Sequence, residues 1–404
     1  MSRLYRGYLA GPVLVALWGV TIVVVATIFV TLGTGMSLRP SPAFSLLAGG
    51  LVGLAIPLTR RPGAVSVVAT LLFAAMAFAG FGPLVTGDDV GAGPASLAGA
   101  VTGGAFSMSA AVILGQMPWG RIDRHEFETC IIRFLTGFGF VVFTTVVLIP
   151  FCVMVATSLK SQQELLQNPL DYSIDLSKGL DIFRSYQELF SDFGFGSYLW
   201  TSFLVSVITV LITLLFSVPG AYAVARLRFT GQRQFSRSIL LIYMVPMIVL
   251  ALPIYMAFSM AGLRNSVFGI ILIYPVTTIP VALYILQGYF RGIPVEIEEA
   301  GLMDGLGRLS VIRRITLPLS LPALVSVALY VFMIAWNEFL LAFMLLDDPS
   351  KFTLTRGVSM LNSSEIPRQH LMAGAVIASV PVLALFLGLE KFITRGLTAG
   401  SVKG

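Results

Sequence analysis

Residues 292–322 read GIPVEIEEAGLMDGLGRLSVIRRITLPLSLP and form a charged stretch between two strongly apolar blocks. Pro294 suits the first turn of a helix, where the N–H that proline lacks would have no partner. Glu296, Glu298 and Glu299 would then lie at the positive end of the helix dipole. We expect a short docking helix here, against which a separate protein pushes.

Glycines and prolines punctuate the rest of this stretch. Gly301 and Gly305 lie about one helical turn apart and would present a flat face that another protein can approach closely. Gly305 and Gly307 allow a backbone turn that residues with a Cβ atom avoid. Pro318 and Pro322 shape the start of the next apolar segment. Composition alone leaves an ordinary amphipathic loop as an open alternative.

The composition is that of a membrane protein. Of 404 residues, 56% are hydrophobic and 11% are charged, and the mean hydropathy is +0.90. Soluble globular proteins carry about 25% charged residues, so we expect the chain to cross a membrane several times. The net charge is +6, and the arginines that contribute to it are scattered over short loops. This distribution fits the positive-inside rule better than a nucleic-acid-binding surface. The two cysteines lie in or beside apolar segments and predict no structural disulfide.

Ten segments are apolar enough to cross the hydrocarbon core, which takes about 20 residues of helix. They lie near residues 8–31, 44–58, 64–85, 95–117, 134–156, 198–225, 238–261, 267–288, 319–345 and 371–393. With ten spans, every arginine-rich loop falls on the same side as both termini. Omitting the shortest segment would break that pattern. We therefore expect an all-α polytopic protein of about ten helices, with both termini in the cytoplasm.

The first four predicted spans differ in character from the last six. They are rich in glycine, alanine and valine, and the pairs Gly49/Gly53 and Gly99/Gly103 allow neighbouring helices to approach closely. No internal repeat links them to the rest. The sequence predicts a four-helix extension at residues 1–117, an amphipathic cytoplasmic linker at 118–133 and a six-helix core at 134–404.

No motif of catalysis or nucleotide binding is present in the sequence. The chain lacks GxxxxGK[ST], HExxH, CxxC and GxSxG, and it has no GxGxxG after a strand. Its two histidines, His125 and His370, lie in loops predicted to be on opposite sides of the membrane, so they cannot share a site. We expect no enzyme activity, no metal and no cofactor in this chain, and no ATP hydrolysis without a P-loop.

Spacing within residues 292–322 gives this stretch a family resemblance. The matching residues are Glu299-Ala300-Gly301, then after three residues Gly305, after nine more Ile315, and after one more Leu317-Pro318. They resemble the coupling-loop signature of permease subunits of binding-protein-dependent ATP-binding-cassette importers: Glu-Ala-Ala, three residues, Gly, nine residues, Ile, one residue, Leu-Pro. Every spacing matches. Gly301 replaces the second alanine, and Asp304 before Gly305 is also similar to the family.

Three further stretches narrow the resemblance: QGYFRGIP at residues 287–294, AWNEF at 335–339 and GLTAGSVKG at 396–404. They resemble sugar-importing, maltose-type permeases, and more closely the second of the two permeases in such transporters. The resemblance covers about residues 134–404, the six-helix core of a type I importer permease. The first four spans depart from that pattern. A similarity to extended permeases of α-glucoside importers adds the expectation of a di- or oligosaccharide substrate.

The resemblance assigns roles to individual residues. Residues 292–316 would include a coupling helix that rests in a groove of an ATPase subunit, with contacts from Glu299, Ala300, Gly301, Asp304, Gly305 and Arg308. The C-terminal tail would reach toward the interface between two ATPases through Gly396, Thr398 and Gly400, the alternative being a frayed terminus. Candidates for the substrate pathway are Trp336, Asn337, Glu338 and Tyr274. Packing or helix termination is the alternative for these residues.

The resemblance also implies partners and an energy source. The chain would form a heterodimer with a second permease and join two ATPase subunits, which hold ATP and Mg²⁺, and a periplasmic or lipid-anchored solute-binding protein. It would move sugar by alternating access across the lipid of a bacterial inner membrane, without nucleic acid. Two alternatives are an ion-gradient-driven secondary transporter and a membrane scaffold without transport. The first requires carboxylates in mid-span, where Glu338 is almost the only one.

Overall fold

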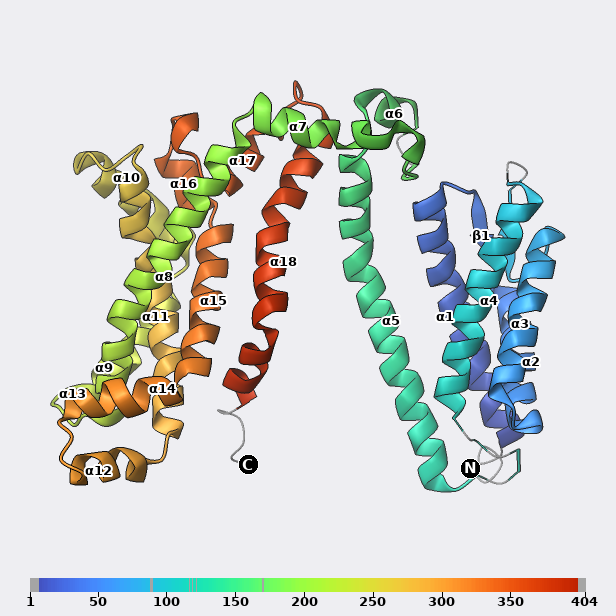
Figure 1. Cartoon of the computed structure of the whole chain (residues 1–404), viewed down its shortest axis with the longest axis horizontal. Coiled ribbons are helices and arrows are strands. Elements are labelled where there is room, and N and C mark those ends of the chain that lie inside the picture. The colour runs from blue at the N-terminus through green and yellow to red at the C-terminus, as the bar shows by residue number, and fades with distance from the viewer. Residues whose placement is uncertain are drawn as a thin grey trace. The chain divides into compact units, whose positions relative to one another are not determined.

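The computed structural model describes residues 7–87, 90–115, 117, 119–120, 122–168 and 171–398. For residues 176, 237, 240, 242–243 and 390–398 it describes the backbone alone. The chain forms two compact units, Met1–Ile182 and Phe183–Gly404, each built almost entirely of helices (Figure 1).

The first unit is a set of paired helices. Its elements are α1 (Gly7–Thr34), β1 (Leu38–Pro40), α2 (Pro42–Thr59), α3 (Pro62–Phe78), β2 (Leu84–Thr86), α4 (Ala92–Leu114), α5 (Arg124–Ser158), α6 (Gln162–Gln167) and most of the 3-10 segment η1 (Leu176–Phe183). Helix α1 pairs with α2, α3 pairs with α4, and α5 packs on α1 and α4. The two short strands pair antiparallel, with Leu38 opposite Thr86, and so connect the α1–α2 and α3–α4 loops.

Glycines bring the helices of each pair into backbone contact. A Cβ atom added at Gly49 or Gly53 of α2 would lie 2.5 or 2.6 Å from a backbone carbonyl oxygen of α1. At Gly99 and Gly103 of α4 it would lie 2.5 and 2.6 Å from atoms of Phe73 on α3. Real Cβ atoms do not approach other heavy atoms so closely, so only glycine fits. The predicted close approach at both glycine pairs is confirmed.

Helix α5 starts earlier than the sequence predicts. Asp123 and Glu126 form a capping box, and no glycine or proline interrupts residues 124–133. These residues, predicted to belong to a separate linker, therefore form the first turns of α5. The compact first unit extends to Ile182, while the division of the sequence at 118–133 stays a prediction.

The second unit contains a bundle of long helices with short helices at both ends. Its elements are α7 (Arg184–Ser191), α8 (Phe195–Arg226), α9 (Gln232–Tyr243), α10 (Met247–Met260), α11 (Val267–Gly292), α12 (Val295–Met303), α13 (Arg308–Val311), the π-helical η2 (Ile312–Thr316), α14 (Leu317–Leu319), α15 (Leu321–Asn337), α16 (Leu340–Leu345), the 3-10 helix η3 (Pro349–Lys351), α17 (Leu354–Met360) and α18 (Arg368–Thr398). Helices α8, α11 and α15 pack on one another, and α18 packs on α15 and α7.

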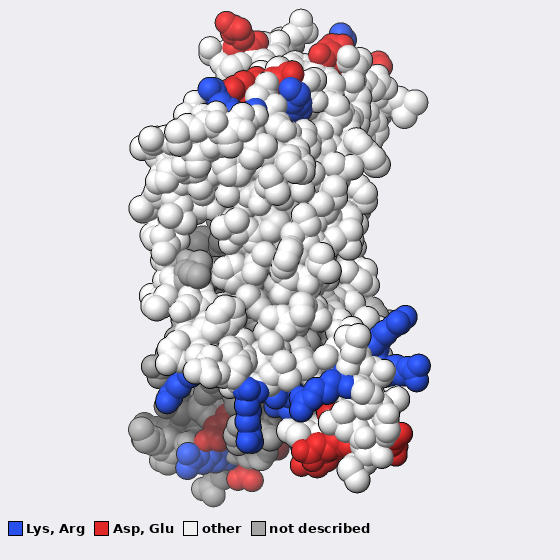
Figure 2. Space-filling view, turned by 90° about the vertical axis from the view of Figure 1, so that its left-hand side faces the viewer, with Lys and Arg blue, Asp and Glu red and all other residues white. Residues whose placement is uncertain are grey.

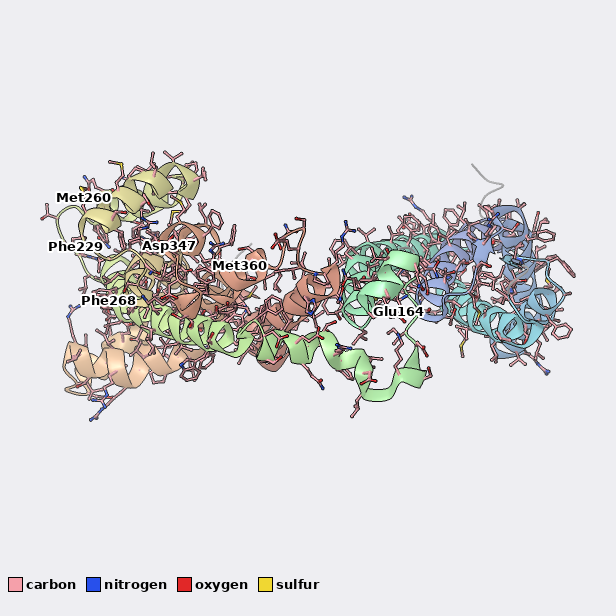
Figure 3. All side chains as sticks on the ribbon, turned by 90° about the horizontal axis from the view of Figure 1, so that it is seen from above. Glu164, Phe229, Met260, Phe268, Asp347 and Met360 are labelled. Atoms are coloured by element: carbon pink, nitrogen blue, oxygen red, sulfur yellow. The ribbon has the colours of Figure 1, made fainter. Side chains whose placement is uncertain are left out.

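The surface of the second unit is banded by charge. Figure 2 shows charged side chains at its two ends and an uncharged belt between them, as expected of a protein that spans a bilayer. Large apolar side chains are exposed on this unit, among them Met260 and Phe268, which are 82% and 60% exposed (Figure 3).

Seven helices within the described residues are long and apolar enough to cross a membrane. The segments Arg308–Leu319 and Leu321–Asn337, bent by 73°, would make an eighth if they count as one span. Helices α3 and α10 are apolar but have only 17 and 14 residues. The all-helical membrane fold is thus confirmed, whereas the count of ten spans stays a prediction.

Two predicted spans are interrupted in the structure. Residues 238–261 divide into α9 and α10 at Pro246, which has no N–H to continue the helix. Residues 319–345 divide where Glu338 takes an extended backbone conformation, so α15 ends at Asn337 and α16 follows. The 73° bend at Ser320 lies between Pro318 and Pro322, which confirms their predicted influence on the start of this segment.

A polar contact fixes the short helix α7 to α18. The Nε2 atom of His370 lies 2.7 Å from Oε2 of Glu188, and Arg184 pairs with Oε1 of Glu188 at 2.8 Å. Hydrogen bonds to Arg184 and His370 hold the pKa of the Glu188 carboxyl below its usual value. His370 therefore has a structural partner in its own unit.

Candidate coupling site

The charged stretch at residues 292–322 folds as a short helix, a turn and a returning helix at the lower end of the second unit (Figure 1). Pro294 is the residue before the first turn rather than part of it, with φ −55° and ψ 132°, and α12 begins at Val295. Glu296 and Glu298 lie in the first turn, where the helix dipole favours carboxylates. The predicted helix is therefore present, one residue later than expected.

The turn after α12 depends on Gly305. Its N–H donates to the carbonyl of Leu302 at 3.1 Å, and the N–H of Leu306 donates to the carbonyl of Gly301 at 3.1 Å. These two bonds make a Schellman motif, which places a residue with positive φ after the helix. Gly305 has φ 85°, where another residue would cost about 1–2 kcal/mol. A Cβ atom there would meet no atom within 4 Å, so the requirement comes from the backbone alone.

Gly301 lets α12 pack on the returning helix. A Cβ atom at Gly301 would lie 2.5 Å from Cδ1 of Ile315, 3.4 Å from Val311 and 3.6 Å from Leu306. The space that an alanine would occupy is thus filled by the end of the Ile315 side chain. Two residues of the coupling-loop pattern, fourteen positions apart in sequence, are neighbours in the fold.

Glu298 joins α12 to α8 and η2 through buried polar contacts. Its Oε2 accepts a hydrogen bond from the Tyr222 hydroxyl at 3.2 Å, and its Oε1 accepts one from the Thr316 hydroxyl at 2.9 Å. The guanidinium of Arg226 lies 3.6 Å from Oε1, and both charged side chains are less than a tenth exposed. Arg226 also donates to the carbonyl of Ile293, so it holds the segment that leads into α12 as well.

From the sequence, Glu298 was expected only to interact with the positive end of the helix dipole. Its buried contacts with α8 and η2 were not predicted. The signal that could have revealed it is helical spacing, because Glu298 precedes Gly301 by three residues and therefore shares its face. Both are buried, whereas Glu296 and Glu299 are exposed. The basic partner, Arg226, lies too far away in sequence for any local pattern to indicate it.

Much of the remaining surface of α12 and of the turn after it is open. Glu299, Ala300, Asp304 and Arg308 are exposed, as are the apolar side chains of Leu302 and Met303, at 38% and 88%. A cavity of about 430 Å³ lies between α8, α12 and α13, lined by Glu299 and Arg308 and also by Glu298 of the buried network. A short helix held rigidly on one face and exposing charge and apolar surface on the other can dock a partner.

The predicted pathway residues have structural partners. The indole N–H of Trp336 donates to the carbonyl of Ala378 on α18 at 3.0 Å, and the ring stacks on Phe332. Asn337 is exposed and donates to the carbonyl of Met333 at 2.9 Å. These contacts accord with packing and helix termination, the alternative considered from the sequence.

Glu338 and Tyr274 are brought together, and Tyr274 belongs to the same buried cluster as Trp336. The Glu338 carboxylate accepts backbone hydrogen bonds from Leu341 at 2.8 Å and Ala342 at 3.2 Å, and so caps α16. The hydroxyl of Tyr274 is buried next to this carboxylate. A role for either side chain in substrate binding stays a prediction.

The C-terminal tail is described only in part. Gly396 and Thr398 belong to the last turn of α18, for which the backbone alone is described, and Gly400 lies outside the described residues. The predicted contact of this tail with ATPase subunits therefore stays a prediction.

Known proteins are similar to this chain in sequence and in fold over about two thirds of its length. A family described as "Binding-protein-dependent transport system inner membrane component" matches residues 217–399. The chain is 37% identical to the inner membrane ABC transporter permease protein YcjP of Escherichia coli over 66% of its length and 95% of that protein. It is 32% identical to the trehalose/maltose transport system permease protein MalG of Thermococcus litoralis, over 69% of this chain and 99% of that one.

A solved structure shows the same fold. A chain of a bacterial ABC transporter involved in import of the acidic polysaccharide alginate matches with a TM-score of 0.55 and 24% identity, over 67% of this chain and 98% of that chain. The sequence matches extend over almost the whole length of YcjP and MalG. The chain therefore belongs to the family of inner-membrane components of binding-protein-dependent transport systems, as an ABC transporter permease.

Proposed function

We propose that this chain is the permease subunit of an ATP-driven importer that carries a di- or oligosaccharide across a bacterial inner membrane. Permeases named for trehalose, maltose and diacetylchitobiose transport are among its relatives and support the sugar class. The resemblance of residues 335–339 to maltose-type second permeases supports a heterodimer with a different permease.

The proposal rests mainly on the structure of helix α12, which is fixed on one face and exposed on the other. Its inner face is fixed by the buried Glu298 network, and its outer face presents Ala300 and Met303 to a partner. A rigid helix of this kind transmits a push to α8 and to the helix that returns toward α15. In the proposed orientation it faces the cytoplasm, with both termini on the same side.

The energy comes from partner subunits in this proposal. Two ATPases bind ATP and Mg²⁺ and each receives a coupling helix, while this chain holds no cofactor of its own. A solute-binding protein delivers sugar on the opposite side. ATP-driven closure of the ATPases turns the permease cavity outward, and hydrolysis returns it inward. Because a partner shifts such an equilibrium only by binding the two states differently, α12 must contact the ATPase differently in each state.

Co-purification tests the proposal against its alternatives. The chain, expressed with the genes of its neighbours and purified from membranes, should retain an ATPase subunit and a second permease. A secondary transporter driven by an ion gradient would transport sugar without either. A scaffold would retain no ATPase and would transport nothing. Absence of an ATPase from a folded, membrane-extracted preparation would overturn the proposal.

A matched pair of glycine substitutions tests α12 itself. Gly305→Val forces a β-branched residue into φ 85°, whereas Gly307→Val adds the same side chain at φ −71°, and at neither position would a Cβ meet an atom within 4 Å. We expect Gly305→Val to reduce sugar uptake per ATP hydrolysed about tenfold, since the turn costs about 1–2 kcal/mol, and Gly307→Val to have little effect.

The measurement is uptake of radiolabelled sugar and ATP hydrolysis by the complete assembly in proteoliposomes. ATPase association is quantified in the same preparations. Unchanged coupling in Gly305→Val, with the ATPase still bound, would contradict the role given to the turn.

A further inference from the structure

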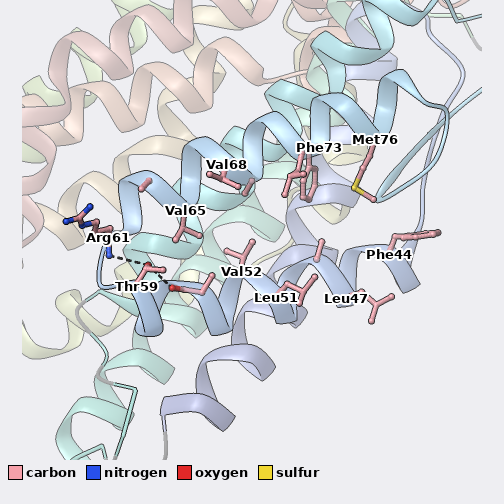
Figure 4. A pocket seen from close by; sticks show the side chains of 15 residues that line it. Phe44, Leu47, Leu51, Val52, Thr59, Arg61, Val65, Val68, Phe73 and Met76 are labelled. Carbon is pink, nitrogen blue, oxygen red and sulfur yellow. Dashed lines mark hydrogen bonds between the residues drawn. The ribbon is translucent and has the colours of Figure 1, made fainter.

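The first unit carries an apolar groove between α2 and α3 (Figure 4). The groove has a volume of about 630 Å³ and runs from Phe44 to Thr59 along α2. Among its lining residues Arg61 is the single charged one, and it lies at one end. The groove is therefore an apolar channel with a cationic end.

Helix pairing explains why the groove exists. Glycines lock α2 to α1 and α4 to α3, as described above for Gly49 and Gly99. The facing sides of α2 and α3 carry alanines instead of large side chains at several depths, including Ala48, Ala55 and Ala64. The two tight pairs thus leave a gap between them that their own side chains do not fill.

The lining and the length of the groove suit a hydrocarbon chain. Helix α2 has 18 residues and is therefore about 27 Å long, close to the hydrocarbon thickness of about 30 Å. Apart from Thr59 and Arg61 at one end, the residues that line the groove are apolar. An acyl chain that enters beside Arg61 can therefore extend along the groove in apolar surroundings.

Charge marks one end of the groove as a headgroup site. Arg60 and Arg61 follow α2 directly, and neither forms an ion pair within the described part of the chain. No aspartate or glutamate occurs in α2 or α3. Basic residues beside gaps between membrane helices are attractive to anionic lipid headgroups.

We propose that this groove binds an anionic phospholipid, with one acyl chain between α2 and α3 and the phosphate at Arg60 and Arg61. The lipid comes from the leaflet adjoining the two arginines, which the positive-inside rule predicts to be the cytoplasmic one. The acyl chain occupies the part of the gap that adjoins the two arginines, so the lipid holds this end of α2 to α3.

Photoreactive lipid tests the site in the complete assembly. The protein is reconstituted in phosphatidylcholine vesicles containing phosphatidylglycerol with a diazirine on its acyl chain, and labelled peptides are mapped by mass spectrometry. We expect label on groove residues of α2 and α3. Arg61→Ala should reduce that label about fivefold, because an arginine near an anionic headgroup contributes about that factor. Arg39→Ala removes an exposed arginine at the other end of α2 and should change nothing.

A second pair of variants tests the acyl-chain channel. Ala55→Phe fills the groove, whereas Ala75→Phe makes the same change at an exposed position of α3 that does not line it. Label in the groove should fall severalfold in Ala55→Phe and persist in Ala75→Phe. Thermal unfolding of each variant shows that the fold is retained.

Three results would overturn the proposal: equal labelling by photoreactive phosphatidylcholine, insensitivity to both Arg61→Ala and Ala55→Phe, or absence of label because a partner helix covers the groove. None of them depends on transport, so failure of the lipid site is distinguishable from failure of the proposed function.

Discussion

Glu298 has the most constrained environment in the coupling site. Its carboxylate meets Tyr222, Arg226 and Thr316, and two of these lie on α8. Removing one partner of a buried ion pair leaves the other charge without compensation, which costs about 3–5 kcal/mol. Because Arg226 would remain buried, the position of α12 depends on this carboxylate.

Substitution of Glu298 should therefore destabilise the protein. We expect Glu298→Ala to lower the free energy of unfolding by about 3 kcal/mol. The exposed Glu296 of the same turn provides the control, and Glu296→Ala should stay within about 0.5 kcal/mol of the unchanged protein. Thermal unfolding of the purified assembly compares them. Equal stabilities of the two variants would contradict the structural role of Glu298.

At the scale of the helices, the first unit contains pairs whose backbones are in contact at glycines. Gly49 faces the backbone of α1, while its neighbour Gly50 faces open space, where a Cβ would meet no atom within 4 Å. Adjacent residues of one helix thus have opposite requirements, because a rotation of about 100° per residue separates their faces.

Valine substitutions at Gly49 and Gly50 test whether only the first of them must be small. Gly49→Val should destabilise the α1–α2 pair by about 1–3 kcal/mol, since overpacking pushes the two backbones apart. Gly50→Val adds the same atoms toward open space and should be nearly neutral. The measurement is the melting temperature of the detergent-solubilised protein. A Gly50→Val variant as unstable as Gly49→Val would show that the helix faces are assigned wrongly.

On the scale of the whole molecule, topology is the property to test. The ten-span prediction requires α2 to cross the membrane, although it has only 18 residues. Its two ends should then lie on opposite sides, with Ser37 before it outside and Thr59 at its end inside.

Single cysteines can locate these two ends. In a chain whose Cys130 and Cys152 are replaced by alanine, Ser37→Cys should react with a membrane-impermeant maleimide in intact cells. Thr59→Cys should react only after permeabilisation. Equal labelling of both residues in intact cells would remove α2 from the spans and reduce the count.

The sequence by itself determined the properties that depend on local spacing and composition. Apolar length indicated a helical membrane protein, and the pattern from Glu299 to Pro318 indicated the permease family and a short helix, whose coupling role stays a prediction. The glycine pairs indicated close helix packing, because glycine has no Cβ atom to keep a neighbouring backbone away.

Only the tertiary structure decided which polar residues are buried and which surfaces stay open. Tyr222 and Glu298 are 76 residues apart, so their contact follows from the packing of α8 beside α12 and not from any local pattern. The groove between α2 and α3 likewise depends on how two glycine-locked pairs meet. Helical periodicity sets the faces of each helix, but the partner of each face is chosen by the packing of the whole unit.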